Sequence, residues 1–148
     1  MAKILLLNGP NLNLLGEREP EIYGSTTLKK IEGDVRSLVE SRGHHLWHFQ
    51  SNSEGEMVDW LQNNRDSAFL LLNAASFTHT SVALRDAVSL LKIPFAEIHI
   101  SNVFKREPFR HQSYFSDLAM GVIAGFGAHG YLLAAQFALD HVDQSHSG

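Results

Sequence analysis

The chain lacks cysteine, so none of its 148 residues can form a disulfide, act as a thiolate nucleophile or bind a metal through sulfur. Long apolar runs are also missing, because neither the opening run nor any later one has the length of a signal-peptide core or a membrane span. Basic residues are not in excess, and the net charge of -4 argues against a general nucleic-acid binder. We therefore expect a cytoplasmic protein without nucleic-acid or membrane partners.

What the sequence does contain is an alternation of short apolar runs with amphipathic helix patterns. The runs are Ile4–Leu7, Leu46–Gln50, Phe69–Leu72, Phe95–Ile100 and Gly121–Phe126, and the helix patterns begin near Thr27, Ser53, Ser81 and Tyr131. Parallel sheets covered on both faces produce this alternation. We predict a single catalytic α/β domain over residues 1–142, a flavodoxin-like doubly wound five-stranded parallel sheet of order 2-1-3-4-5 with helices on both faces, and a disordered tail at 143–148.

The connection over residues 9–24 is longer than the roughly 2–6 residues usual between a strand and a helix. Four apolar residues could anchor this connection to the body of the protein, namely Leu12, Leu14, Leu15 and Ile22. We therefore predict that residues 9–24 form an ordered lid. A free tyrosine has a pKa of about 10 and is a poor base at neutral pH, but a guanidinium within a few ångströms favours the phenolate. Arg18 and Tyr23 could form such a pair, and a surface salt bridge beside a packing tyrosine is the alternative.

Polar residues follow the carboxyl ends of the predicted strands, where doubly wound sheets bind ligands. Asn73, His99 and Ser101 lie at two of these ends, and His79 lies in the loop after the third strand. Glu97 is two residues before His99 on one strand, so the two project to the same face. The carboxylate could fix the tautomer of the imidazole and make His99 a general acid, with a structural ion pair as the alternative.

Lys105, Arg106, Arg110 and His111 form a local basic cluster in an otherwise acidic sequence. Arg106 and Arg110 are four residues apart and could face one ligand, and guanidinium groups suit a carboxylate or a phosphate. A solvated loop would carry charges too. Because the cluster follows His99 closely, we assign both arginines to the binding of an anionic substrate.

Two other patterns point to different chemistry. Gly125–Gly130 fits the G-x-G-x-x-G spacing of a dinucleotide site, but no further strand with an acidic residue follows it in this sequence. His44, His45 and His48 resemble metal ligands, yet no nearby carboxylate completes a set. We therefore expect neither a cofactor nor a metal.

Several segments, taken together, resemble the type II 3-dehydroquinate dehydratases. They are Asn-Gly-Pro-Asn-Leu-Asn-Leu-Leu-Gly, Arg-Glu-Pro-Glu-Ile-Tyr-Gly, Gln-Ser-Asn-Ser-Glu-Gly-Glu, Thr-His-Thr-Ser-Val-Ala-Leu-Arg-Asp-Ala, Glu-Ile-His-Ile-Ser-Asn and Arg-Glu-Pro-Phe-Arg-His-Gln-Ser-Tyr, in that order between about Ile4 and Leu139. One segment departs from the family: Asn-Ala-Ala-Ser-Phe, from Asn73 onward, stands where the family more often has Asn-Pro-Gly-Ala-Tyr. That difference leaves the turn after the third strand undetermined.

The resemblance implies anti elimination of water from 3-dehydroquinate through an enolate, which gives 3-dehydroshikimate in the shikimate pathway without metal or cofactor. Tyr23 would remove the C2 proton with Arg18 beside it, and Asn11 would hold a water at the enolate oxygen. His99, oriented by Glu97, would protonate the departing hydroxyl. The resemblance further implies a homododecamer of four trimers and the substrate-binding residues Asn73, His79, Ile100, Ser101 and Arg110, with Asp86 from a neighbouring subunit.

Two rival interpretations stay open at this point. A regulatory module that binds a phosphorylated small anion at the same sheet edge would need the arginines but not Tyr23. A metal-dependent hydrolase would use the histidines between 44 and 48 and would be inactivated by chelators.

Overall fold

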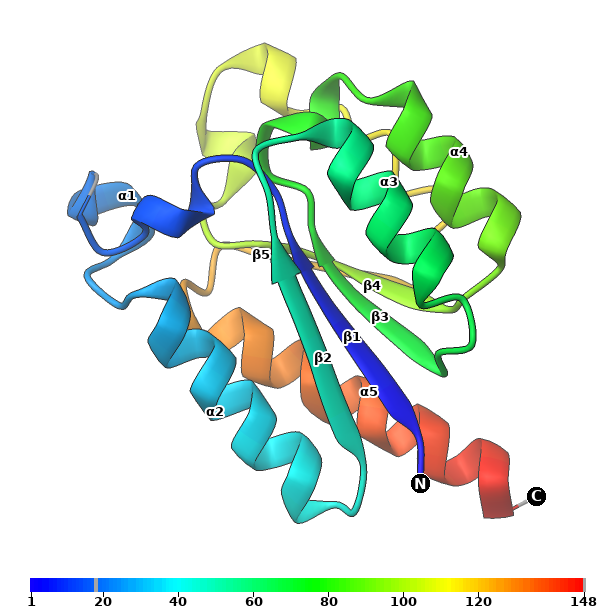
Figure 1. Cartoon of the computed structure of the whole chain (residues 1–148). Helices are drawn as coiled ribbons and strands as arrows, with labels where there is room; N and C mark the ends of the chain where they lie inside the picture. Colours follow the sequence, from blue (N-terminus) through cyan, green and yellow to red (C-terminus); the bar gives the residue numbers. More distant parts are fainter. Residues whose placement is uncertain (18, 148) are drawn as a thin grey trace.

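The computed structural model describes residues 1–17 and 19–147 (Figure 1). Its centre is a five-stranded sheet in the order β2-β1-β3-β4-β5, in which all neighbouring strands are parallel. The predicted strand order and class are therefore confirmed, with boundaries that differ by two residues or fewer. The strands are β1 (Lys3–Asn8), β2 (His45–Gln50), β3 (Phe69–Asn73), β4 (Phe95–His99) and β5 (Gly121–Ala124).

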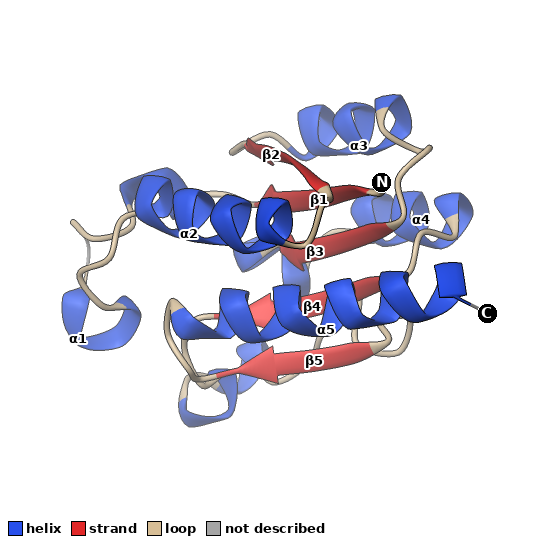
Figure 2. Cartoon of the chain, turned by 90° about the horizontal axis from the view of Figure 1, so that it is seen from below, coloured by secondary structure: helices blue, strands red, loops and turns tan. Residues whose placement is uncertain are grey.

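Helices cover both faces of this sheet. α2 (Leu28–Ser41) and α5 (His129–Ser147) lie over one face, and α3 (Glu54–Asn63) and α4 (Val82–Leu91) lie over the other (Figure 2). Every residue of the central strands β3 and β4 is buried, which explains their continuous apolar sequences. The two apolar layers use alternate residues of each strand, so that Leu6 and Leu71 pack under α2 and α5 while Leu5 and Leu70 pack under α3 and α4.

Three of the helices begin at a hydroxyl residue that accepts a hydrogen bond from the first turn: Thr27, Ser53 and Ser81. At α3 the cap continues through Ser51. Its hydroxyl donates to the Glu56 carboxylate at 2.5 Å and accepts from the Ser53 backbone N–H at 2.9 Å. This arrangement ties the end of β2 to the start of α3.

No long helix connects β4 to β5 in the described chain; two short 3-10 turns take its place, η3 (Val103–Lys105) and η4 (Pro108–Arg110). The connection then runs back to the start of β5. On the way, the side chain of Phe115, which has no exposed surface, packs in the core beside α3 and α4. The loop is thereby attached to the body at a point close to β4.

The lid over residues 9–24 lies at the carboxyl ends of the strands, away from both termini (Figure 1). It contains a 3-10 turn, η1 (Leu12–Leu14), and a four-residue helix, α1 (Pro20–Tyr23). Of its four apolar side chains, Leu12 and Leu15 are buried in the core, whereas Leu14 and Ile22 are exposed.

Helix α5 continues to Ser147 in the structure, whereas the sequence analysis expects a tail from residue 143. Asp143 accepts hydrogen bonds from Arg42 at 2.6 Å and from the buried His44 ring at 2.7 Å. These contacts hold the helix against the loop between α2 and β2. None of the helices over 1–17 and 19–147 is long and apolar enough to cross a membrane.

A buried hydroxyl joins α5 to the ends of the neighbouring strands β1 and β3. The Tyr131 hydroxyl donates to Asn8 Oδ1 at 2.7 Å and accepts from Asn73 Nδ2 at 2.8 Å. All three side chains have at most 3 % of their surface exposed, and burial raises the pKa of Tyr131, so the hydroxyl keeps its proton. Asn8 and Asn73 are register partners in the β1–β3 pair, and Tyr131 thus fixes the floor of the region where the strands end.

Replacing Tyr131 by Phe should lower the free energy of unfolding by about 1–3 kcal/mol, because two buried amide groups lose their partner. Urea denaturation followed by circular dichroism measures this loss. Tyr114→Phe is the matched control, since Tyr114 is partly buried and its hydroxyl makes no hydrogen bond to another described residue. Equal stabilities of the two variants would contradict the importance of the buried hydroxyl.

Candidate active site

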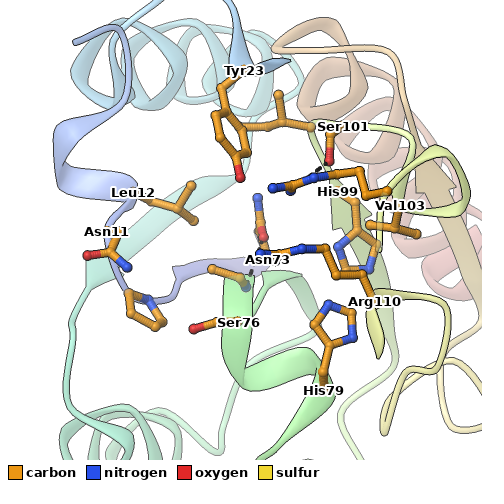
Figure 3. A pocket seen from close by; sticks show the side chains of 14 residues that line it. Asn11, Leu12, Tyr23, Asn73, Ser76, His79, His99, Ser101, Val103 and Arg110 are labelled. Carbon is orange, nitrogen blue, oxygen red and sulfur yellow. Dashed lines mark hydrogen bonds between the residues drawn. The ribbon is translucent and has the colours of Figure 1, made fainter. Parts of the chain in front are cut away.

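A cavity of about 190 Å³ opens where β1, β3 and β4 end (Figure 3). Its walls come from the lid, from the 3-10 turn η2 (Ala75–His79) after β3, from the end of β4 and from the β4–β5 loop. The fold brings together groups that lie far apart in the sequence. Nine of the residues assigned to a site from the sequence line this cavity: Asn11, Tyr23, Asn73, His79, His99, Ile100, Ser101, Arg106 and Arg110.

Of the three other assigned residues, two are described and lie outside the cavity wall. Glu97 is buried on β4 behind His99, with 2 % of its surface exposed. Asp86 is exposed on α4 and is not part of the cavity wall. Arg18 lies outside the described residues, so its place beside Tyr23 stays a prediction.

His99 and Glu97 form the hydrogen bond expected from their spacing on one strand. The Nε2 atom of His99 lies 2.5 Å from Oε2 of Glu97, and the imidazole has 7 % of its surface exposed. Because an ionised carboxylate only accepts hydrogen bonds, Nε2 carries the shared hydrogen. Nδ1 is then the ring nitrogen available to the cavity, and it carries a second proton whenever the imidazole is charged.

Two serines that the sequence analysis missed also bind Glu97. The hydroxyl of Ser113 donates to Oε2 at 2.8 Å, and that of Ser116 donates to Oε1 at 2.6 Å. Burial on its own raises the pKa of the Glu97 carboxyl, but the hydrogen bonds from His99 and the serines outweigh it and hold the pKa below the ordinary 4.5. A buried carboxylate predicts such donors, but the sequence does not tell which loop hydroxyls reach it.

His79 faces the same cavity as a neutral imidazole. Its Nδ1 donates to the backbone carbonyl of Gln112 at 2.7 Å, which leaves Nε2 as an acceptor. Partial burial lowers the pKa of His79, and the positive charge of the neighbouring His99 and Arg110 adds to that effect. His79 is therefore suited to accept a hydrogen bond from a hydroxyl group rather than to bind an anion.

Tyr23 is the last residue of α1, and its hydroxyl points into the cavity (Figure 3). The guanidinium carbon of Arg106 lies 5.2 Å from the centroid of the Tyr23 ring, within cation–π range. The same guanidinium is 3.4 Å from the Ser101 hydroxyl. The sequence analysis assigned Arg106 to substrate binding alone, and the structure adds this contact with the phenol ring.

Arg110 brings the second guanidinium to the cavity. Its Nε donates to the Glu107 carboxylate at 2.5 Å, and this bond holds the pKa of Glu107 below its ordinary value. Because only Nε is used in this bond, the two Nη groups remain for an anionic ligand.

The turn after β3, undetermined by the sequence, contains a left-handed alanine. Ala75 has a φ of 52°, a conformation that costs an alanine roughly 1–2 kcal/mol relative to a right-handed one. The Asn73 side chain supports this turn, because its Oδ1 accepts from the Ala75 backbone N–H at 3.1 Å. Asn73 is thus held at both ends of its amide, by Ala75 and by Tyr131.

The start of the lid is packed closely against this turn. A Cβ atom on Gly9 would lie 2.3 Å from the backbone oxygen of Ala74, so only glycine fits there. Asn11 adopts a left-handed conformation with φ of 70°, which asparagine tolerates well, and its backbone N–H donates to Asn52 Oδ1 at 2.9 Å. The polar residues after β2 therefore position the lid and do not line the cavity.

The two competing patterns have structural explanations. His44 binds Asp143, and His48 Nδ1 lies 3.0 Å from Glu32, so each ring has a partner of its own. Over the described part of the chain, no group of three or more histidine, aspartate or glutamate side chains is arranged to hold a metal. Gly125 and Gly127 both have positive φ angles, which the turn between β5 and α5 requires.

These features define a class: a flavodoxin-like α/β protein with a cavity at the carboxyl edge of its sheet, lined by a phenol, two guanidinium groups and an imidazole that is hydrogen-bonded to a buried carboxylate. The comparisons with known proteins agree. The family model described as "Dehydroquinase class II" matches residues 2–139. The chain belongs to this family, the type II dehydroquinases.

Relatives of known name resemble the chain over nearly its whole length. It is 57 % identical over 146 residues to "3-dehydroquinate dehydratase 1" of Pseudomonas aeruginosa, which covers 97 % of this chain and 99 % of that protein. It is 55 % identical over 147 residues to the "3-dehydroquinate dehydratase" of Stutzerimonas stutzeri, with 98 % and 100 % covered. The crystal structure of the type II dehydroquinase from Butyrivibrio crossotus superposes with a TM-score of 0.89 at 37 % identity, covering 93 % of this chain and 97 % of the other.

The buried carboxylate predicts a specific pH dependence of stability. Because the pKa of Glu97 is lower in the folded protein than in the unfolded chain, its contribution is present above about pH 4.5 and is lost as the pH falls through the folded-state pKa. We expect the free energy of unfolding to fall less between pH 6 and pH 3.5 in Glu97→Gln than in the wild type. Urea denaturation at several pH values measures the difference.

Glu40→Gln is the control for this experiment, because Glu40 is an exposed glutamate on α2. Its pH dependence should follow that of the wild type. A Glu97→Gln curve parallel to both would contradict the assignment of a stabilising buried carboxylate.

Proposed function

We propose that this protein is a 3-dehydroquinate dehydratase that removes water from 3-dehydroquinate by anti elimination, through an enolate, to give 3-dehydroshikimate in the shikimate pathway. The observation that carries the proposal is that one cavity holds a phenol from the lid, an imidazole paired with a carboxylate, and two guanidinium groups. Family membership supports the same reaction. A reducing compartment, the cytoplasm, suits a chain without cysteine.

In this proposal Tyr23 is the base. The C2 proton lies next to a ketone, and its removal needs a positioned group that is ionised at neutral pH. Arg106 brings one positive charge close to this phenol, with its guanidinium carbon 5.2 Å from the centroid of the Tyr23 ring. In this mechanism Arg18 is the lid cation that acts on the Tyr23 phenol and stabilises the transition state, and Asn11 holds the water that stabilises the enolate oxygen.

His99 is the acid. A hydroxyl group leaves readily only when it is protonated as the bond breaks. With Nε2 bonded to Glu97, the charged imidazole presents Nδ1–H to the cavity, so Nδ1 delivers the proton. Glu97 stabilises the charged form of the ring before transfer.

The remaining cavity residues hold the substrate. Arg110 binds the substrate carboxylate through its Nη groups, and Arg106, which lines the same cavity, contributes to the binding of this carboxylate. His79 accepts a hydrogen bond from one hydroxyl group of the substrate through Nε2. Asn73, at the floor of the cavity, binds a second hydroxyl group of the substrate. The backbone N–H groups of Ile100 and Ser101, which line the cavity, bind the same carboxylate.

A homo-oligomer is part of the proposal, with the dodecamer of four trimers as its specific form. The edge strand β5 and the adjacent face of α5 expose large apolar side chains around a shallow cavity, a surface typical of protein–protein contact. They are Met120, Val122, Leu133 and Phe137. Asp86 is exposed on α4, which suits contact with the substrate of a neighbouring subunit.

The function is tested by an absorbance assay for the conjugated enone of 3-dehydroshikimate, run with a chelator present. Tyr23→Phe should bind substrate with affinity close to the wild type but lose about 10²–10⁴-fold in turnover, because the base is missing. Calorimetry measures the binding. Tyr114→Phe is the control, since that phenol is not in the cavity wall.

The base and the acid can be told apart because removal of the C2 proton precedes loss of the hydroxyl group in the proposed mechanism. In D₂O, His99→Ala should exchange the C2 proton of the substrate while losing water slowly, and Tyr23→Phe should do neither; proton NMR follows both. Near-normal turnover by Tyr23→Phe would rule out the proposed base and favour a regulatory module that only binds an anion. Loss of activity with chelator alone would favour the metal-dependent hydrolase.

The shared site is tested by mixing subunits. If each site uses Tyr23 of one chain and Asp86 of another, hybrids of Tyr23→Phe and Asp86→Ala chains regain activity at about a quarter of their sites, because one site in four then has both residues. Sedimentation confirms the assembly against the 16.5 kDa chain mass. A single-chain mass, or hybrids no more active than their parents, would contradict shared sites.

A further inference from the structure

We propose that Ser113 and Ser116 are positioning residues for the reaction: together they hold the Glu97 carboxylate ionised and directed at His99. This inference rests on the proposed function, because it assigns a role to the two serines in the acid step. Neither serine lines the cavity, so neither can act on the substrate directly.

The carboxylate of Glu97 has three donors and almost no contact with solvent. Its Oε2 accepts from His99 and from Ser113, and its Oε1 accepts from Ser116. A buried carboxylate without donors takes up a proton, and a protonated Glu97 would no longer stabilise a charged imidazole. The serines therefore supply what solvent supplies to an exposed carboxylate.

Ser113 can only donate to Glu97. Its hydroxyl oxygen has two lone pairs, and both are used, by the backbone N–H groups of Phe115 at 3.0 Å and of Ser116 at 3.2 Å. Its hydrogen is thus committed to Oε2, which also accepts from His99. A proton on Oε2 would make this oxygen a weaker acceptor for the Ser113 hydrogen, so the bond from Ser113 favours the ionised carboxylate.

Ser116 controls the remaining oxygen. For Glu97 to take up a proton on Oε1 and donate it, the Ser116 hydroxyl would have to change from donor to acceptor. While Ser116 donates, Oε1 acts as an acceptor, and this favours the ionised carboxylate with the hydrogen of the short bond on the imidazole. Ser116 is the better residue to test, because its hydroxyl bonds to Glu97 whereas that of Ser113 also holds the turn.

The pH at which the Glu97–His99 pair loses its shared proton also depends on the other charged groups nearby. Among residues 1–17 and 19–147, the charged or titratable side chains that line the cavity beside it are His79, Arg106, Arg110 and Tyr23, and none of them is changed in the variants below. Removing a donor from Glu97 makes its negative charge less favourable once the imidazole has lost its proton. The Glu97–His99 pair should then keep its shared proton to a higher pH.

The test compares Ser116→Ala with Ser116→Thr, which keeps the hydroxyl and has room at this exposed position, and with Ser67→Ala. Ser67 is the control because its hydroxyl donates to the backbone carbonyl of Asn64, near the opposite end of β3. Histidine NMR follows the titration of the His99 ring and needs no activity. Steady-state kinetics gives kcat and KM over the same pH range.

We expect Ser116→Ala to raise the pH at which the His99 ring loses its proton by about half a unit or more and to lower kcat about tenfold, with KM within about twofold of the wild type. Ser116→Thr should restore both the titration and kcat. Ser67→Ala should leave both unchanged. Ser113→Thr should resemble the wild type as well.

An unchanged His99 titration in folded Ser116→Ala overturns the proposal whatever the enzyme does. So does an equal loss in Ser116→Thr, which would make the position merely structural. If the wild type dehydrates no 3-dehydroquinate while the titration still shifts, the proposed function fails and the positioning of the Glu97–His99 pair stands.

Discussion

A negative charge buried at the centre of the sheet governs how this molecule is organised. Glu97 lies on β4, a strand without an exposed residue, and folding can keep its carboxylate ionised only by surrounding it with donors. The β4–β5 connection returns across the sheet and supplies two of them, Ser113 and Ser116. The same connection carries Arg106 and Arg110, so the solvation of one charge also determines where the cationic groups of the cavity lie.

The floor of the cavity follows from a second constraint, the buried hydroxyl of Tyr131. Asn8 and Asn73 are the last residues of neighbouring strands, and the Tyr131 hydroxyl forms a hydrogen bond with the side-chain amide of each. Asn73 in turn holds the turn that begins with Ala75, and this turn contacts Gly9 at the start of the lid. Floor, turn and lid are therefore connected by backbone and amide contacts that leave little freedom to the cavity.

Most of the fold was predictable from the sequence because burial imposes a pattern on it. Continuous apolar runs mark strands covered on both faces, and Thr27, Ser53 and Ser81 mark helix starts through local hydrogen bonds. Most of the assigned site residues meet in one cavity because they end parallel strands or lie in the loops that follow. The contacts of Ser113 and Ser116 with Glu97, and that of Arg106 with the Tyr23 ring, were not predictable, since they depend on the three-dimensional path of a loop without periodicity.

Ala75 has a consequence for the design of inhibitors. Ala75 lines the cavity, and it lies in the segment Asn-Ala-Ala-Ser-Phe, where the family resemblance leads us to expect a glycine instead. A compound that fills the empty space above such a glycine in a relative would collide with this methyl group here. A compound that packs against the methyl group would gain apolar contact that glycine cannot provide, and one small side chain could thus separate the inhibitor profiles of two otherwise similar enzymes.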